Sequence, residues 1–333
     1  HLHQEHGRLN RAFLDEQAGI IAGRLEEGKP CPVCGSREHP NPAPVAETDY
    51  LVLESTYGSR NHERHTDTIE VLAELIENTL SRGGNVVIPS FAIGRTQELL
   101  YAIREIKQRK LVKNMDFPVY VDSPLAKRAT TIFCGDLRGY LDEDALELVQ
   151  DGTHMFNFSN LRMTTGAEDS KALNTDQTPK VIISASGMCE AGRIRHHLKH
   201  NLWRKESTIL FVGYQSEGTV GRKLIDGAET VRLFGEEITV EAHIESLSGI
   251  SGHADRDQML SWLASMPRKP RQVFVNHGDD QVTDRFAETI EKTLAIPSAA
   301  PYSGDGYDLL TGQCIARGRI VRATRLTDGR RRA

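Results

Sequence analysis

Short apolar strands that alternate with helical segments between residues 50 and 277 constrain the fold of this chain more than any other feature. Apolar residues recur at helical spacing at 69–80 and 96–108. This alternation is typical of an α/β fold with largely parallel sheets, whereas the period-two pattern of 231–248 predicts an antiparallel hairpin around Gly235. The predicted strands are YLVLEST (50–56), NVVIPS (85–90), FPVYVDS (117–123), KVIISAS (180–186), TILFVGY (208–214) and RQVFVNH (271–277).

Polar and glycine-rich sequences follow most of these strands. In open α/β sheets, ligands bind beyond the carboxyl ends of the strands. Hydroxyls and glycine amides that precede helix N-termini bind anions, so phosphate is the predicted ligand class. The sequences at strand ends are ESTYG (54–58), PSFAIGRTQE (89–98), DSPLA (122–126), SASGM (184–188), GYQSEGT (213–219), SGHAD (251–255) and NHGD (276–279).

Composition limits the class of protein. A length of 333 residues predicts about two domains, and a formal net charge of −5 argues against a globally basic nucleic-acid binder without excluding a local basic cleft. No apolar run reaches the roughly 18–20 residues that span a bilayer. The absence of an apolar signal core and the odd number of five cysteines predict a reduced, cytoplasmic protein without membrane partners.

A Pro- and Gly-rich segment at 28–47 separates a different kind of sequence at the N-terminus. Residues 8–27 predict a helix, and its apolar positions are spaced by four, three and four residues. Two interpretations stay open, a coiled-coil seam and an amphipathic helix packed on the main domain. The apolar positions are Leu14, Ala18, Ile21 and Leu25.

Three of the strand-end motifs resemble those of the β-CASP metallo-β-lactamase ribonucleases, in the order of that family, over about residues 45–320. Glu54 in LESTYG is similar to motif A, His253 in SGHAD to motif B and His277 in VNHGD to motif C. The resemblance implies zinc-dependent hydrolysis of RNA phosphodiester bonds. Glu54 would orient His253 as a catalytic proton donor, and His277 would ligate zinc. From the residues alone, Glu54 could instead cap a turn, and His253 could N-cap the following helix.

The same resemblance predicts the domain organisation. It implies an incomplete metallo-β-lactamase αββα fold at 45–61 and 206–333, with an inserted β-CASP α/β domain at 62–205. Strand 208–214 would return the chain to the first sheet.

PSFAIGRTQE and SASGMCEAGRIRHHL resemble segments with which the β-CASP domain holds the RNA backbone. A His at motif C also favours single-stranded RNA as the partner, because DNA-processing members typically carry Val there. In RHHLKH (195–200), His196 and His200 have metal-capable spacing, and a solvated or phosphate-facing surface is the alternative. The predicted substrate-binding residues are Ser90, Arg95, Ser184, Ser186, Gly187 and Arg193.

Most metal ligands of that family are not recognisable in this sequence. A two-zinc hydrolase needs several ligands for each metal, and the family supplies them from an H-x-H-x-D-H loop, a further His and a bridging Asp before motif A. HLHQEH (1–6) is a near-match, H-x-H-x-E-H, to this loop. No strand precedes it and residues 7–53 are too few for the intervening elements, so coincidence is the favoured interpretation.

Residues 13–40 resemble the zinc hook of SbcC-type DNA-repair ATPases, in which two chains share one zinc at a C-x-x-C apex. Cys31 and Cys34 are the matching pair, with His39 as an extra candidate ligand. We therefore interpret the chain as a hook-like segment (1–44) joined near 41–45 to a β-CASP nuclease. The resemblance implies a zinc-dependent ribonuclease that we expect to be inactive as this chain. The alternatives are a non-catalytic RNA-binding module and a hook that forms a homodimer.

Overall fold

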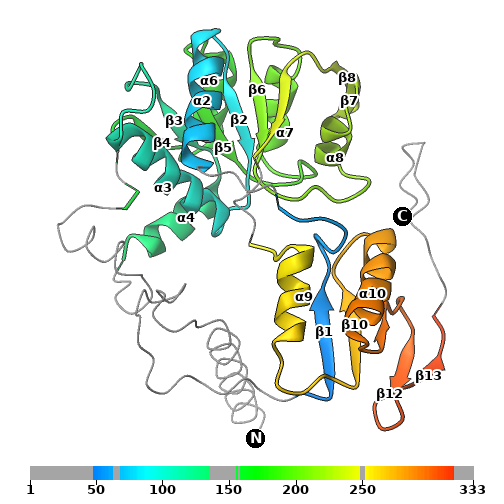
Figure 1. Cartoon of the computed structure of the whole chain (residues 1–333). Helices are drawn as coiled ribbons and strands as arrows, with labels where there is room; N and C mark the ends of the chain where they lie inside the picture. The colour runs from blue at the N-terminus through cyan, green and yellow to red at the C-terminus, as the bar shows by residue number, and fades with distance from the viewer. Residues whose placement is uncertain (1–47, 63–67, 136–154, 157, 248–251, 319–333) are drawn as a thin grey trace, which may run out of the picture. The chain divides into compact units, whose positions relative to one another are not determined.

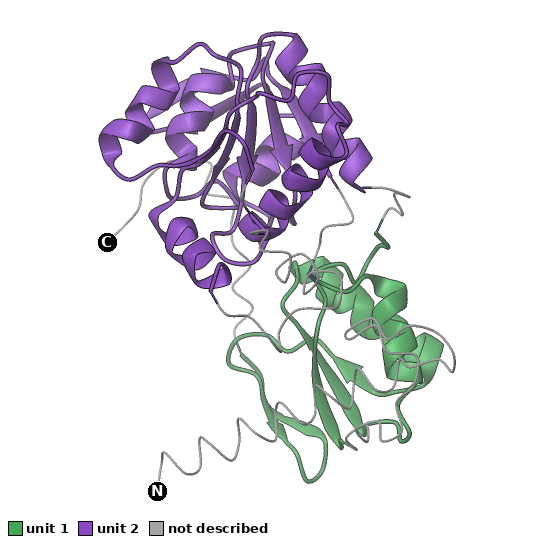
Figure 2. Ribbon diagram, turned by 90° about the vertical axis from the view of Figure 1, so that its left-hand side faces the viewer, with its two compact units in different colours: residues 1–62, 253–333 green, residues 63–252 purple. Residues whose placement is uncertain are grey.

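The computed structural model describes residues 48–62, 68–135, 155–156, 158–247 and 252–318. The chain divides into two compact units (Figures 1 and 2). Unit 1 combines the described residues up to His62 with those from His253 onward, and unit 2 is formed by the described residues of the intervening sequence, 63–252. The predicted helix at 8–27, Cys31, Cys34 and the HLHQEH sequence lie outside the described residues.

Unit 1 is built on a parallel sheet in the order β1-β10-β11. Helices α9 and α10 cover one face of this sheet, where Leu53, Val273 and Val275 form a core with their apolar residues. On the other face, Phe274 packs edge-on against Tyr307 of the β12–β13 hairpin, with ring centroids 4.8 Å apart. The elements are β1 (Tyr50–Glu54), α9 (Arg256–Ala264), β10 (Gln272–Asn276), α10 (Asp280–Leu294), β11 (Ser298–Ala299), β12 (Gly306–Asp308) and β13 (Gln313–Ala316).

Unit 2 contains a parallel sheet in the order β4-β3-β5-β2-β6-β9. Both faces are covered, because Val86 and Ile88 join a core with α2, α3 and α4, while Val87 joins a second core with α7 and α8. The elements are α2 (Thr68–Ser81), β2 (Val86–Pro89), α3 (Arg95–Gln108), β3 (Val119–Val121), α4 (Pro124–Phe133), β4 (Leu161–Met163), α6 (Ala167–Thr175), β5 (Val181–Ser184), α7 (Ile194–Asn201), β6 (Thr208–Phe211), α8 (Val220–Ile225), β7 (Thr230–Leu233), β8 (Glu236–Thr239) and β9 (His243–Ser246).

The predicted α/β fold and its strands are confirmed, but the path after residue 205 differs from the prediction. Strand β6 stays in the unit 2 sheet between β2 and β9, so the prediction that 208–214 returns the chain to the first sheet is wrong. All four residues of β6 are buried, and two neighbouring strands with helices on both faces provide that burial. The compact unit consequently extends to Gly252.

The period-two segment also divides differently from the expected single hairpin. Strands β7 and β8 form the predicted antiparallel pair, with Phe234 and Gly235 at positive φ in the turn. Strand β9 instead pairs in parallel with β6. Among the described residues, no helix has the length and apolar character needed to cross a membrane.

Candidate active site

Glu54, His253 and His277 meet in unit 1 at the carboxyl ends of two neighbouring strands. The parallel register pairs Glu54 with Asn276, so that the residue after β10, His277, lies beside the end of β1. His253 lies two residues before Asp255, the N-cap of α9. One ligand atom from each of the three residues lies within 4.8 Å of the others, so the residues that resemble motifs A, B and C converge on one site.

Glu54 contacts the imidazole of His253 and accepts hydrogen bonds from the backbone amides of Thr56 and Ala254. Its Oε2 atom lies 2.8 Å from Nδ1 of His253 and accepts a hydrogen bond from the amide of Thr56 (3.2 Å). Its Oε1 atom accepts from the amide of Ala254 (3.2 Å). The carboxylate therefore fixes His253 with Nδ1–H towards Glu54 and with Nε2 on the opposite side of the ring. The alternative that His253 caps the helix is wrong, because Asp255 accepts from the amide of Gln258 (2.8 Å).

Thr56 is a residue of this site that the sequence reasoning missed. Its buried hydroxyl oxygen lies 3.2 Å from Nδ1 of His277, 3.2 Å from the His277 carbonyl oxygen and 3.3 Å from Nδ1 of His253. A hydroxyl has one proton to donate and two lone pairs. We assign the Thr56 hydroxyl as the donor to the His277 carbonyl oxygen and as the acceptor from Nδ1–H of His277. This tautomer leaves Nε2 of His277 unprotonated, as a metal ligand must be. The position of Thr56 in ESTYG, two residues after Glu54, was the sequence signal that could have identified it.

The loop after β10 approaches the loop after β1 so closely that one residue must be glycine. A Cβ atom on Gly278 would lie 2.4 Å from Oγ and 2.9 Å from the carbonyl oxygen of Ser55. The Ser55 hydroxyl donates in turn to the Asn276 carbonyl (2.9 Å). His277 itself has a φ of 51°, and its amide donates to the side chain of Asn276 (2.8 Å). These contacts hold His277 against the end of β1.

We expect Gly278→Ala to destabilise unit 1 by about 1–3 kcal/mol, because the added methyl group overlaps Ser55. Gly252→Ala is the matched control, since a Cβ atom there meets nothing within 4 Å. Urea unfolding of both variants, followed by Trp262 fluorescence in a Trp203→Leu background, measures the difference. Equal midpoints for the two variants would show that the close approach at Gly278 is unimportant.

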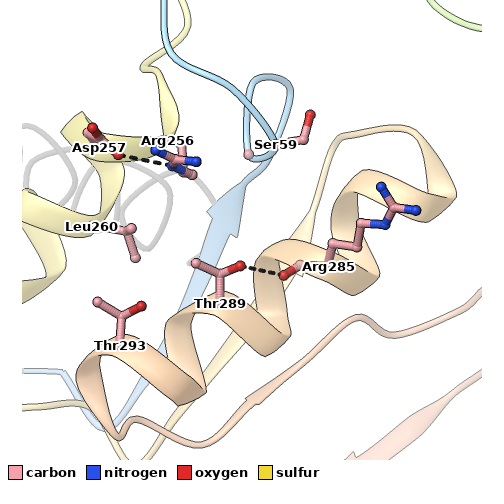
Figure 3. A pocket seen from close by; sticks show the side chains of 8 residues that line it. Ser59, Arg256, Asp257, Leu260, Arg285, Thr289 and Thr293 are labelled. Atoms are coloured by element: carbon pink, nitrogen blue, oxygen red, sulfur yellow. Dashed lines mark hydrogen bonds and ion pairs between the residues drawn. The ribbon is translucent and has the colours of Figure 1, made fainter.

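A pocket of about 380 Å³ lies in the same unit but does not include these three residues (Figure 3). Nε of Arg256 pairs with Asp257 (2.9 Å), and the Thr289 hydroxyl donates to the Arg285 carbonyl (2.7 Å). The pocket shares no lining residue with the Glu54, His253 and His277 cluster. It is lined by Gly58, Ser59, Arg256, Asp257, Leu260, Arg285, Thr289 and Thr293.

Two of the predicted substrate-binding serines in unit 2 have a different role. Ser90 and Ser184 are each 1% exposed. The Ser90 hydroxyl contacts Phe91 O and Thr96 Oγ1 (both 3.2 Å), and the Ser184 hydroxyl donates to the Asp122 carbonyl (2.8 Å). Because these hydroxyls point inward, they brace the loops after β2 and β5 instead of facing a ligand, which corrects the prediction.

The two predicted arginines differ in their surroundings. Arg95 forms an ion pair with Glu98 on the first turn of α3. Arg193 lies 2.7 Å from a carboxylate oxygen of the fully buried Asp122, while 24% of its own side chain stays exposed. Asp122 thus holds the Arg193 guanidinium in place at the carboxyl end of the sheet.

Asp122 is a second residue that the sequence reasoning did not select, although it stands in DSPLA. Its carboxylate also accepts from Thr164 (2.5 Å), Ser170 (2.6 Å) and His197 (2.6 Å). Burial acts to raise the pKa of Asp122, but the hydrogen bonds from His197, Ser170, Thr164 and Arg193 outweigh burial and hold the pKa well below its usual range. The group is therefore a buried carboxylate with donors on both oxygens.

The remaining predicted residues lie in the loop after β5 and on α7. Ser186 is half-buried and its hydroxyl donates to the Ala191 carbonyl (3.1 Å), while Gly187 is buried beside Phe91. His197 is buried against Asp122 and Asn174, and His196 stacks on Phe234 with centroids 4.4 Å apart. Within the described part of the chain, the candidate metal cluster is Glu54, His253 and His277, and RHHLKH contributes none.

Comparisons with known proteins agree with this geometry. Residues 96–224 match the family model of the Beta-Casp domain, and residues 237–301 match the Zn-dependent metallo-hydrolase RNA specificity domain. Ribonuclease TTHA0252 of Thermus thermophilus is 37% identical over 250 residues, which are 74% of this chain and 56% of the relative.

Two archaeal proteins are also similar. An RNase J-like protein of Methanocaldococcus jannaschii is 34% identical over 263 residues, covering 78% of this chain and 59% of the relative. Transcription termination factor FttA of Methanosarcina mazei is 31% identical over 268 residues, covering 78% and 41%. The chain thus spans about half the length of the curated relatives that it matches.

Proposed function

Since this chain belongs to the β-CASP metallo-β-lactamase family, we propose that it carries part of the active site of a zinc-dependent hydrolase that processes single-stranded RNA. The observation that carries the proposal is the meeting of Glu54, His253 and His277 at the ends of β1 and the loop after β10. Residues 48–62 and 253–318 are then the C-terminal part of the metallo-β-lactamase domain, and unit 2 is the β-CASP domain.

In this proposal, the Glu54–His253 pair moves a proton. Nδ1–H of His253 stays hydrogen-bonded to Glu54, with Nδ1 and Oε2 2.8 Å apart. The proton given to the leaving oxygen of the cleaved phosphodiester is therefore the one on Nε2 of His253. The Glu54 carboxylate stabilises the charged imidazolium before that transfer. His253 is 40% exposed, which gives a substrate access to the ring.

His277 suits zinc. It offers Nε2, and an imidazole nitrogen is an ordinary zinc ligand. When zinc is bound, it polarises the phosphoryl oxygen and activates water. Outside the Glu54–His253 pair, the described part of the cluster contributes one ligand, His277. That observation favours the second candidate function, a module that binds RNA without cutting it.

Binding of single-stranded RNA tests what both candidate functions share. We propose that Arg95, Ser186, the Gly187 amide and Arg193 hold the RNA backbone. Fluorescence anisotropy with a labelled RNA of about 12 nucleotides should show binding that weakens as salt rises and persists in chelator. Arg193→Gln should weaken it, while Arg232→Gln, on the β7–β8 hairpin, should not. RNA affinity that is undetectable at low salt would reject both candidate functions.

The assigned tautomer of His277 can be tested without a metal. Thr56→Val removes the hydroxyl that accepts Nδ1–H, so His277 should change from one dominant tautomer to a mixture. Thr56→Ser should keep the wild-type tautomer. Nitrogen-15 NMR of the histidine rings at a pH above 8 measures the populations. A wild-type protein with Nε2 protonated at His277 would contradict the assignment.

We also propose that Cys31 and Cys34 bind a separate zinc shared between two chains in the cytoplasm. A single C-x-x-C supplies two thiolates, and a structural zinc takes four ligands, so the second pair comes from a partner chain or from His39 together with another group. Native mass measurement should give a dimer that dissociates in chelator. A zinc-containing monomer that resists chelator would contradict this arrangement.

A further inference from the structure

The loop after β2 exposes two apolar side chains although its backbone is firmly held. Phe91 and Ile93 are 51% and 60% exposed, while Ala92 between them is buried. The Phe91 carbonyl accepts from the amide (3.2 Å) and the hydroxyl (2.7 Å) of Thr96. The buried Gln97 side chain accepts from the Gly94 amide (2.7 Å) and donates to the Ala92 carbonyl (3.3 Å). The loop therefore presents its aromatic ring from a fixed backbone.

The ring of Phe91 rests on the neighbouring loop. Strands β2 and β5 are paired, with Pro89 opposite Ser184, so the loops that follow them are adjacent. A Cβ atom on Gly187 would lie 3.3 Å from Cδ2 and Cε2 of Phe91. The absence of a side chain at Gly187 thus lets the ring lie against the backbone, while half of Phe91 stays exposed.

We propose that Phe91 is a stacking platform for a nucleobase of single-stranded RNA. The ring lies at the carboxyl edge of a parallel sheet, where α/β proteins bind ligands. At the same edge, the partly exposed guanidinium of Arg193 is held by Asp122. Exposed aromatic rings and cations along one surface are the combination with which proteins bind single strands, because every base has a face to stack. The assignment rests on the proposed RNA function and names one of its subsites.

Substitutions that separate stacking from apolar area test this subsite in the full chain. Phe91→Leu keeps an apolar side chain but removes the ring, and we expect it to weaken binding of a labelled oligoadenylate roughly 5- to 100-fold. Phe91→Trp should retain the affinity, and its indole fluorescence should be quenched by the RNA. Trp203→Leu is the matched control, since Trp203 is 55% exposed in the turn that enters β6, at the opposite edge of the sheet.

An RNA of the same length without bases distinguishes binding through base stacking from binding through the phosphates. Phe91→Leu should not change the affinity for this abasic RNA. Equal effects of Phe91→Leu and Phe91→Trp on oligoadenylate, or no effect of either, would overturn the assignment, as would a loss that persists on abasic RNA. If Phe91→Leu changes the oligomeric mass and leaves the RNA affinity unchanged, Phe91 belongs to a protein-docking surface, and the stacking assignment is also overturned. If wild type itself fails to bind RNA, the proposed function fails first.

Discussion

The 333-residue chain, supplied with zinc or manganese, should bind single-stranded RNA and leave it uncut. His277 is the one family metal ligand recognisable in the sequence, and one imidazole does not hold a metal firmly enough to lower the pKa of bound water from 15.7 towards ~7. Hydrolase activity depends on that shift, so we expect a deficit of many orders of magnitude relative to a complete active site. Incubation with end-labelled RNA, beside a His253→Ala control, measures it.

Efficient cleavage by the wild type that His253→Ala abolishes would contradict this expectation. It would also make HLHQEH (1–6) a metal-binding loop, because those residues fit the H-x-H-x-E-H pattern. Cleavage that is equal in both proteins would indicate a contaminating nuclease.

Asp122→Asn should cause the largest loss of stability of any single substitution considered for unit 2. The carboxylate is fully buried and accepts hydrogen bonds from Arg193, His197, Thr164 and Ser170. An amide leaves the Arg193 guanidinium without a counter-charge and weakens the hydrogen bond that the buried His197 donates, which costs about 3–5 kcal/mol. Asp169→Asn is the control, because Asp169 is exposed. Urea unfolding of the two variants should differ clearly, and equal midpoints would contradict the structural role of Asp122.

The same carboxylate predicts how stability depends on pH. The folded pKa of Asp122 is held below its unfolded value of about 3.9. The unfolded chain therefore binds the proton first, so the stabilisation is present above about pH 4 and is lost as the pH falls through the folded pKa. Acid titration followed by circular dichroism should show this loss in the wild type and a shallower loss in Asp122→Asn.

Strands β2, β5 and β6 could be predicted because each is a mainly apolar run that is buried on both faces. In β2, for example, Val86 and Val87 enter different cores, so no alternation of polar residues interrupts the run. The sheet that a strand joins is harder to predict. The apolar sequence TILF (208–211) would suit either sheet, and its place between β2 and β9 depends on pairings that composition does not encode.

Glu54, His253 and His277 could be identified from their motifs, whereas the roles of the polar groups at the strand ends of unit 2 could not. The direction of the Ser90 hydroxyl is set by Thr96 and by the Phe91 carbonyl, so a serine at a strand end can equally face a ligand or the core. Asp122 likewise acquires its role from Ser170 and His197, which are 48 and 75 residues away in sequence.

The central claim is that Glu54 and His253 form the proton-donating pair of an RNA hydrolase. The most direct test is a chimera in which a family segment with the H-x-H-x-D-H loop, the further His and the bridging Asp precedes residue 45. With zinc, this chimera should cleave single-stranded RNA, and His253→Ala should lower kcat by roughly 100-fold or more while zinc content and RNA affinity stay unchanged. A folded, zinc-loaded chimera whose cleavage is insensitive to His253→Ala would contradict the account.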